Sequence, residues 1–179
     1  MKSIVISINP EHALNILKGD KTRELRKSVP KDFIGWVYVY VTKGNPHPDH
    51  NVFLYENQKL NGTIPFRFWF DWYDKLTKDI MSKAEIKYVS RIYTDEKYVL
   101  EDAFLTKEEL LNCDNGKNLY AWHISKVEVF DKPMELGEFY TWDIKRWHED
   151  GSGLFTHWKQ VKHPPQSYQY VWVKGESNE

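Results

Sequence analysis

The sequence predicts an α+β fold in which a mixed β-sheet curls into a barrel and one to three short helices flank it. Segments with the alternating pattern of β-strands outnumber helical segments, and they lie far apart along the chain, so the sheet must join distant segments. The 179 residues suffice for one domain with a buried core, whereas two domains would be a tight fit. We therefore expect residues 1–179 to form a single domain.

The first predicted elements are a strand and a short helix. Ile4, Ile6 and Ile8 alternate with smaller or polar residues, which indicates a strand. Asn9-Pro10-Glu11 then has the features of a helix start, because asparagine caps the free amides and proline suits the first helical position. Gly19 is placed to end this helix.

The middle of the chain contains one clear strand and two stretches without a regular pattern. Residues 21–27 are expected to be extended, and the strand from Trp36 to Thr42 is apolar on both faces, which predicts a central position in the sheet. Residues 43–82 combine loop residues with an aromatic run, and residues 137–153 combine tryptophans with glycines. We expect both of these stretches to be insertions outside the regular fold.

The remaining predicted elements are three strands and a helix. A strand is expected over Ala84–Tyr93, and Thr106 with Glu109 forms a capping box that predicts a short helix. A long strand is expected over Leu119–Phe130, ended by Pro133. The last strand is expected over Ser167–Lys174, after two prolines.

Composition excludes several classes of protein. No apolar run approaches the roughly 20 residues of a membrane-spanning helix, and the first ten residues are too short and polar for a signal peptide, so we expect a cytoplasmic protein with no membrane contact. Cys113 is the only cysteine, which excludes an internal disulfide and a cysteine metal cluster. The net charge is −1, but residues 1–50 hold eight Lys and Arg against five Asp and Glu, a mildly basic segment that could meet phosphate.

The segment Gly19-Asp20-Lys21-Thr22-Arg23-Glu24-Leu25-Arg26 has the pattern that most suggests chemistry. Glu24 and Arg26 are two residues apart and share one face of a strand, with Leu25 on the opposite face toward the core. Lys21 lies on the preceding turn, so two cations and one carboxylate can converge. Such a set can bind phosphate, activate water or polarise a carbonyl. The alternative is a structural salt-bridge ladder on an exposed strand.

This segment resembles the start of the ASCH family, within the PUA-like superfamily. The hallmark of that family is G-x-K-x-x-E-x-R, and Gly19, Lys21, Glu24 and Arg26 fill it. Two further segments resemble the family: Leu119-Tyr120-Ala121-Trp122-His123-Ile124, with Asp131-Lys132-Pro133 and Leu136, and Pro164-Pro165-Gln166-Ser167-Tyr168-Gln169-Tyr170-Val171. The likeness covers about two-thirds of the chain.

The resemblance implies a PUA-like β-barrel with a cleft beside the motif and a role in binding RNA or nucleotide-like ligands. Lys21, Arg26, Gln166, Ser167 and Tyr168 are the expected ligand-binding residues. Some members resemble ribonucleases, and others are amidohydrolases that deacylate N4-acetylcytidine through a K-x-x-T motif. This chain has Glu24 at the threonine position, so Lys21 and Glu24 would be the catalytic residues of any hydrolase here.

Other candidate residues are open to two interpretations. His123 is either an acid–base group or a hydrogen-bonded core residue. His47 and His50 form an H-x-x-H pair on a proline-rich loop, which is a weak metal signal, and we expect no metal and no other cofactor. Alternating aromatic residues could form a stacking surface beside the motif, although core packing is the favoured interpretation: Trp36, Tyr38 and Tyr40.

Three functions follow from these patterns. The first is binding of RNA or a nucleotide ligand at the motif, which the family resemblance favours. The second is hydrolysis of RNA or of a modified nucleoside by Lys21 and Glu24. The third is a protein-interaction module in which the motif is structural and the aromatic loops bind a protein partner. The sequence leaves the oligomeric state open.

Overall fold

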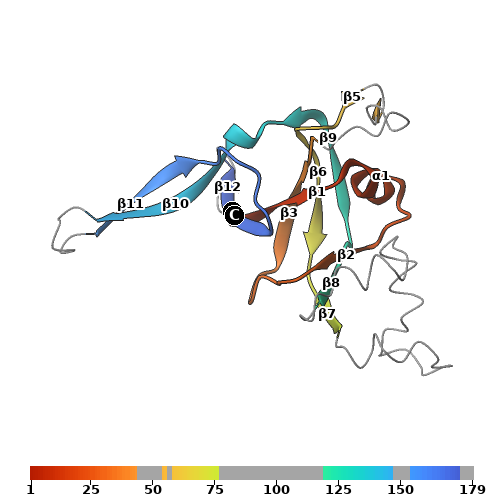
Figure 1. The fold of residues 1–179 in the computed structure, drawn as a ribbon, viewed down its shortest axis with the longest axis horizontal. Helices are drawn as coiled ribbons and strands as arrows, with labels where there is room; N and C mark the ends of the chain where they lie inside the picture. The colour runs from red at the N-terminus through yellow and green to blue at the C-terminus, as the bar shows by residue number, and fades with distance from the viewer. Residues whose placement is uncertain (44–53, 56–57, 77–118, 147–153, 174–179) are drawn as a thin grey trace.

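The computed structural model describes residues 1–43, 54–55, 58–76, 119–146 and 154–173, and its largest element is a seven-stranded sheet (Figure 1). The strand order is β11-β10-β12-β1-β3-β6-β9. Only β1 and β3 pair in parallel among these neighbours. The bounds of these strands are β1 Ser3–Ile8, β3 Gly35–Val41, β6 Ile64–Phe70, β9 Val127–Met134, β10 Phe139–Arg146, β11 Leu154–Gln160 and β12 Tyr168–Val173.

Smaller elements complete the described structure. A three-stranded sheet has the order β2-β8-β7, and a two-stranded sheet joins β4 and β5. Helix α1 spans Pro10–Lys18, and a 3-10 turn spans Leu136–Glu138. The bounds of the short strands are β2 Arg23–Arg26, β4 Leu54–Tyr55, β5 Gln58–Lys59, β7 Tyr73–Leu76 and β8 Leu119–His123. Within the described ranges, no helix has the length and apolar character needed to cross a membrane.

The described residues agree with the predicted fold in having a mixed sheet and one α-helix, but the described strands form an open sheet and show no closed barrel. The sheet ends at β9 on one side and at β11 on the other, and these edges do not pair. Strands β10 and β11 instead form a hairpin that projects from the body of the molecule (Figure 1). The hairpin joins the sheet only where Phe139 and Tyr140 pair with β12, so it extends the sheet without returning to close it.

Helix α1 begins and ends as the sequence predicts. The Asn9 side chain accepts a hydrogen bond from the Glu11 amide at 2.9 Å, and Pro10 occupies the first turn. Gly19 has the left-handed conformation, with φ 81°, and its amide donates to the Ile16 carbonyl at 3.0 Å. Ala13 and Ile16 are buried in the core, so the apolar stripe of the helix holds it to the protein.

Strand β3 is central, and its two faces line two different hydrophobic clusters. Val37, Val39 and Val41 pack with the residues of β1 and α1. Tyr38 and Tyr40 are buried in a second cluster on the other face. This confirms that these tyrosines are core residues, and it places them on the sheet face opposite α1.

Two predicted insertions contain strands of the main sheet, so both predictions are wrong in part. Within residues 43–82, β6 lies between β3 and β9, and Phe66, Phe68 and Phe70 face the core at every second position. The aromatic run is therefore a buried strand, with aromatic residues at alternate positions. Within residues 137–153, β10 forms one strand of the hairpin.

The predicted long strand Leu119–Phe130 is two strands that belong to different sheets. The Ile124 amide donates to the Thr22 carbonyl at 3.0 Å, next to β2, whereas the Trp69 amide in β6 donates to the Lys126 carbonyl at 2.8 Å. The chain therefore passes from the three-stranded sheet to the seven-stranded sheet between β8 and β9. Pro133 lies inside β9 rather than ending it, because an edge strand tolerates a missing donor.

Of the other predicted features, the last strand is confirmed and the rest lie outside the described residues. The last strand, β12, agrees with the prediction to within one residue at each end. The strand predicted over Ala84–Tyr93, the helix predicted after Thr106, Cys113, His47 and His50 all lie outside the described residues.

Candidate functional site

The G-x-K-x-x-E-x-R motif runs from the end of α1 into β2, and the helix end fixes its first residues. After Gly19, the amides of Asp20 and Lys21 both donate to the Asn15 carbonyl at 3.0 Å. This turn directs the chain back toward the protein, and only 2% of Lys21 is exposed. A lysine is seldom this buried unless its ammonium group has partners.

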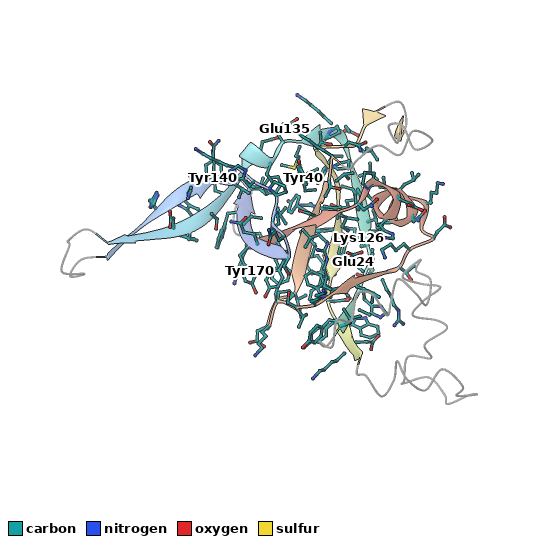
Figure 2. All side chains as sticks on the ribbon, viewed as in Figure 1. Glu24, Tyr40, Lys126, Glu135, Tyr140 and Tyr170 are labelled. Atoms are coloured by element: carbon teal, nitrogen blue, oxygen red, sulfur yellow. The ribbon has the colours of Figure 1, made fainter. Side chains whose placement is uncertain are left out.

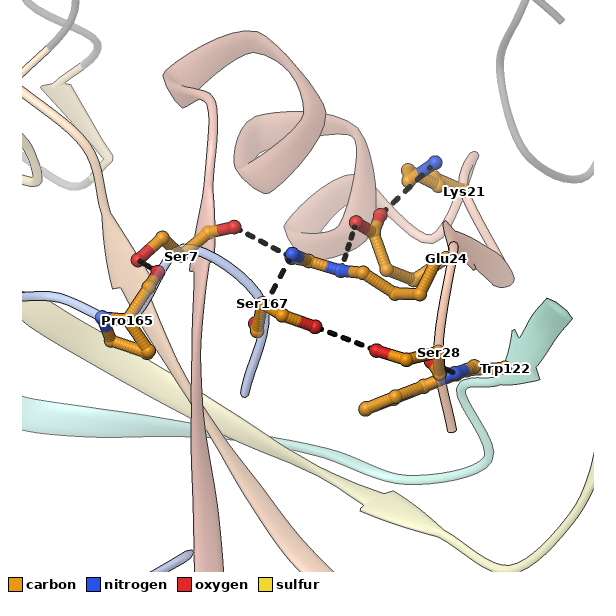
Figure 3. A network of polar contacts seen from close by, with 8 residues as sticks. Ser7, Lys21, Glu24, Ser28, Trp122, Pro165 and Ser167 are labelled. Carbon is orange, nitrogen blue, oxygen red and sulfur yellow. Dashed lines mark hydrogen bonds and ion pairs between the residues drawn. The ribbon is translucent and has the colours of Figure 1, made fainter. Parts of the chain in front are cut away.

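Lys21, Glu24 and Arg26 form the ion pairs that the sequence allowed (Figure 3). One oxygen of Glu24, Oε2, lies 3.4 Å from Lys21 Nζ, and the other, Oε1, lies 3.1 Å from Arg26 Nε. The predicted ladder is therefore present, but the side chains are largely buried rather than on an exposed strand. Removing charges from water is costly, so this cluster needs its mutual contacts to form.

The prediction that Leu25 points into the core is wrong. Glu24 lies opposite Trp122 in the register between β2 and β8, and Trp122 is fully buried in the core. Glu24 is therefore on the inner face of β2 and is 8% exposed, whereas Leu25 is half-buried on the outer face. In this short strand the charged Glu24 faces inward and the apolar Leu25 faces outward, which is the reverse of the usual arrangement.

Arg26 connects β2 to two other segments that are distant in sequence. Its Nη2 donates to the Ser7 carbonyl at 2.6 Å, in β1, and its Nη1 donates to the Ser167 carbonyl at 3.4 Å, just before β12. The guanidinium group thereby holds Glu24, β1 and the entry to β12 together (Figure 3). Arginine suits this role because its donors form a rigid planar fork.

Two serines extend this network to the surface. The hydroxyl groups of Ser28 and Ser167 lie 2.7 Å apart, in an exposed setting. The Ser28 carbonyl accepts a hydrogen bond from the Trp122 indole at 3.2 Å, which anchors the serine to the core. The Ser7 hydroxyl donates to the Pro165 carbonyl at 2.7 Å and so fixes the segment that carries Ser167.

Ser7 and Ser28 belong to the network but were not predicted from the sequence. Ser28 could have been found by continuing the period of two from Glu24 through Arg26, although β2 itself ends at Arg26. Ser7 had no such signal, because its contribution is a backbone carbonyl and a hydroxyl contact to a residue 158 positions away.

The residues predicted beside Ser167 have different places in the structure. Gln166 is exposed next to Ser167. Tyr168 is half-buried, its hydroxyl donates to the Val29 carbonyl at 3.3 Å, and its ring contacts that of Trp122. The network therefore unites Lys21, Glu24, Arg26 and Ser167, while Gln166 and Tyr168 border it.

His123 lies on the other face of the three-stranded sheet and is separate from this network. It pairs in register with Arg23, and its Nε2 lies 3.5 Å from Asp74 Oδ2, which also pairs with Arg23 at 2.8 Å. Its ring stacks on Trp72. Burial lowers the pKa of His123, the Arg23 charge lowers it further, and Asp74 partly opposes both.

No metal ligands gather in the described part of the chain, where no group of three or more His, Cys, Asp or Glu residues could hold an ion. The chemistry available to the network is that of two cations around one carboxylate, with two hydroxyl groups at the surface. Cations and hydroxyl groups are suited to phosphate oxygens and to the polar edges of bases.

The described fold has clear relatives among solved structures, whereas comparisons with protein-family models and with curated proteins give no match. The crystal structure of ASCH from Zymomonas mobilis matches with a TM-score of 0.56 and 16% identity, over 97% of this chain and 88% of that one. The chain has the fold of an ASCH domain. A serine-to-alanine variant of the Zymomonas protein matches with a TM-score of 0.55 and 17% identity, over 97% and 89% of the two chains. A tyrosine-to-phenylalanine variant matches with a TM-score of 0.51 and 17% identity, over 98% and 92%.

The fold assignment gives the motif a structural context. In this ASCH fold, the glycine of the motif ends the helix, and its lysine, glutamate and arginine form the buried ion pairs. The second segment that resembles the family supplies Trp122, which holds Ser28, and the third supplies Pro165 and Ser167. The three segments are thus joined by hydrogen bonds around one site.

Proposed function

We propose that this protein binds RNA or a nucleotide-like ligand at the network formed by Lys21, Glu24, Arg26, Ser28 and Ser167. The observation that carries the proposal is the convergence of these residues from separate parts of the chain on one polar network, buried at Lys21 and open to solvent at the two serines. A purely structural ion cluster has no need of exposed hydroxyl groups beside it.

The charges of the network favour an anionic ligand. Glu24 stands between two cationic groups, and Arg26 also presents its fork toward the backbone beside Ser167. Backbone phosphates are bound by lysine, arginine and serine side chains, and base edges are read by hydroxyl and amide groups. Ser28, Ser167 and the exposed Gln166 supply these hydroxyl and amide groups at the surface.

The ASCH fold supports the same proposal, because folds of the PUA-like type resemble RNA-binding domains. The fold by itself does not fix the ligand, since one fold can carry many functions. The proposal therefore rests on the site residues, and the fold makes RNA the first ligand to test.

The test is fluorescence anisotropy with a labelled single-stranded RNA, titrated with the full chain at several salt concentrations. We expect binding that weakens with salt. Lys21→Gln should weaken binding, because it removes the buried cation that holds Glu24 in the network, while the slope of log Kd against log salt should change little. The hydroxyl groups of the exposed Ser167 and the half-buried Ser28 offer a gentler change, and Ser28→Ala with Ser167→Ala should weaken binding without altering that slope.

Matched controls separate a site effect from a general one. Lys132 is an exposed lysine near the far end of β9, and Ser125 is an exposed serine whose hydroxyl donates to the Trp69 carbonyl. Lys132→Gln and Ser125→Ala should leave binding unchanged, and urea unfolding of each variant reports whether it has folded. Absence of RNA binding at low salt, or equal reductions in affinity for the site variants and the controls, would overturn the proposal.

Hydrolysis is a second candidate because Lys21 and Glu24 place an acid and a base 3.4 Å apart. Wild-type protein would then cleave RNA or release acetate from N4-acetylcytidine, and Glu24→Gln would abolish turnover while still unfolding cooperatively. Activity that persists in folded Glu24→Gln would exclude Glu24 as the general base. If the protein binds RNA or the nucleoside but forms no product, only the ligand-binding function is supported.

A further inference from the structure

Strand β12 carries a row of aromatic residues that begins at the proposed ligand site. Tyr168, Tyr170 and Trp172 alternate along the strand, share one face, and are each half-buried. Ser167, whose hydroxyl belongs to the site, directly precedes this row. The strand rise of about 3.3 Å per residue puts Trp172 about 13 Å from Tyr168.

Two exposed tryptophans of the projecting hairpin continue this row. Trp142 in β10 and Trp158 in β11 are register partners, and their ring centroids are 4.1 Å apart. Both rings also contact Trp172, at 6.3 Å from Trp142 and 5.1 Å from Trp158. Despite these contacts, Trp142 is 45% exposed and Trp158 is 47% exposed. We call Tyr168, Tyr170, Trp172, Trp142 and Trp158 the aromatic track.

The cation Lys2 and polar residues lie around the aromatic track, together with the carboxylate of Asp32 and with Phe33, whose ring centroid is 5.9 Å from that of Tyr170. Lys2 places its Nζ 3.9 Å from the centroid of the Tyr170 ring. Tyr140 pairs in register with both Trp172 and Gln160, so its neighbours on this part of the sheet are polar or aromatic. Strand β12 leads from Ser167 to the hairpin, where Trp172 pairs with Tyr140, and Figure 2 labels Tyr170 and Tyr140 in this part of the molecule.

The charged pairs of the hairpin lie on the opposite face. Asp143 is 3.7 Å from Lys159 Nζ and 3.9 Å from His157 Nε2, and these three residues alternate with Trp142 and Trp158 along their strands. One face of the hairpin thus carries charges that pair with each other, and the other face carries the two tryptophans.

We infer that a single-stranded RNA held at the proposed site continues along the aromatic track and stacks its bases on the exposed rings. This inference rests on the proposed function and adds the path and the strandedness of the ligand. Bases splayed from a single strand stack on aromatic side chains without regard to sequence, and a cation such as Lys2 can meet a phosphate beside them. Continuity with the site and the cation over Tyr170 favour RNA over an apolar protein partner.

The length of the bound RNA distinguishes this path from the site alone. A trinucleotide reports binding at the site, whereas oligouridines of about 6 to 12 nucleotides can also reach the hairpin. Wild-type protein should bind the longer oligomers more tightly than the trinucleotide. The double variant Trp142→Ala with Trp158→Ala should lose roughly 5- to 150-fold in affinity for the long oligomers and keep the affinity for the trinucleotide.

Trp72→Ala is the matched control, because Trp72 is 48% exposed but stacks on His123 on the three-stranded sheet. It should leave the affinity unchanged for every length. If the double variant still binds long oligomers more tightly than the trinucleotide, or if the wild type binds both equally, RNA does not follow the aromatic track, while the proposed function stands. If no oligomer of any length binds, both fail. A wild-type dimer in light scattering that the double variant dissociates would instead assign the face to a second copy of the chain and overturn the inference.

Discussion

Replacing Glu24 by glutamine removes the carboxylate that pairs with both Lys21 and Arg26. Its two oxygens are 3.4 Å from Lys21 Nζ and 3.1 Å from Arg26 Nε, so the change leaves two cationic groups close together without their shared anion. Breaking a buried ion pair in this way costs about 3–5 kcal/mol. Arg26 keeps its carbonyl acceptors at Ser7 and Ser167, so we expect the low end of that range, about 3 kcal/mol.

Urea unfolding followed by tryptophan fluorescence measures this decrease in stability, since the chain has eight tryptophans. With a slope near 2 kcal/mol per molar, a decrease of about 3 kcal/mol lowers the urea midpoint by about 1.5 M. Glu128 provides the matched control, because it pairs with Lys126 at 2.6 Å and with Arg67 at 2.9 Å but its side chain is 32% exposed. Glu128→Gln should cost only about 0–1 kcal/mol, as exposed pairs do.

The comparison of the two variants decides whether burial sets the strength of the motif's ion pairs. Equal decreases in stability for Glu24→Gln and Glu128→Gln would refute the reasoning, because each carboxylate pairs with two cationic side chains and the two differ mainly in exposure. A slope that changes in Glu24→Gln would show instead that the unfolding reaction itself has changed.

Three further predictions test the fold and one titration. Gly19→Ala should cost about 1 kcal/mol in urea unfolding, because φ is +81° there and a Cβ meets nothing within 4 Å; an unchanged stability would contradict the strained backbone conformation. Phe68→Ala should lower the free energy of unfolding by about 3–5 kcal/mol in the same measurement, since the side chain is fully buried in β6. A decrease below about 1 kcal/mol would show that Phe68 is not buried in the core. Burial and then Arg23 lower the pKa of His123, so its contribution to stability is present above the unfolded pKa of about 6.5 and is lost as the pH falls toward the folded pKa. The urea midpoint should therefore fall between about pH 7.5 and about pH 5.5, and less so in His123→Asn; identical falls in both proteins would exclude His123 as a source.

Elements with a strong local pattern could be predicted from the sequence. The helix start at Asn9 and Pro10 and the helix end at Gly19 are determined by capping and backbone freedom, which act over a few residues. The alternation in β1 and the two apolar faces of β3 likewise depend on the period of the strand alone. The motif residues were identified by their spacing and by the resemblance to the ASCH family.

Strand boundaries that depend on pairing could not be predicted in this way. The break between β8 and β9 exists because the two halves pair with different sheets, and no residue in Leu119–Phe130 signals that change of partner. The place of the aromatic strand β6 between β3 and β9 was decided by pairing with strands distant in sequence, which the pattern of the run itself does not indicate.

The sequence by itself determined the motif: a glycine that ends α1, followed by a lysine, a glutamate and an arginine that can form ion pairs. The tertiary structure decided that Glu24 rather than Leu25 faces inward, because β2 pairs with β8 so that Glu24 lies opposite the buried Trp122. It also decided that Ser7, Ser28 and Ser167 join the network, through contacts between residues up to 158 positions apart. Period and spacing describe which residues share a face, whereas packing against the rest of the chain determines which face is buried.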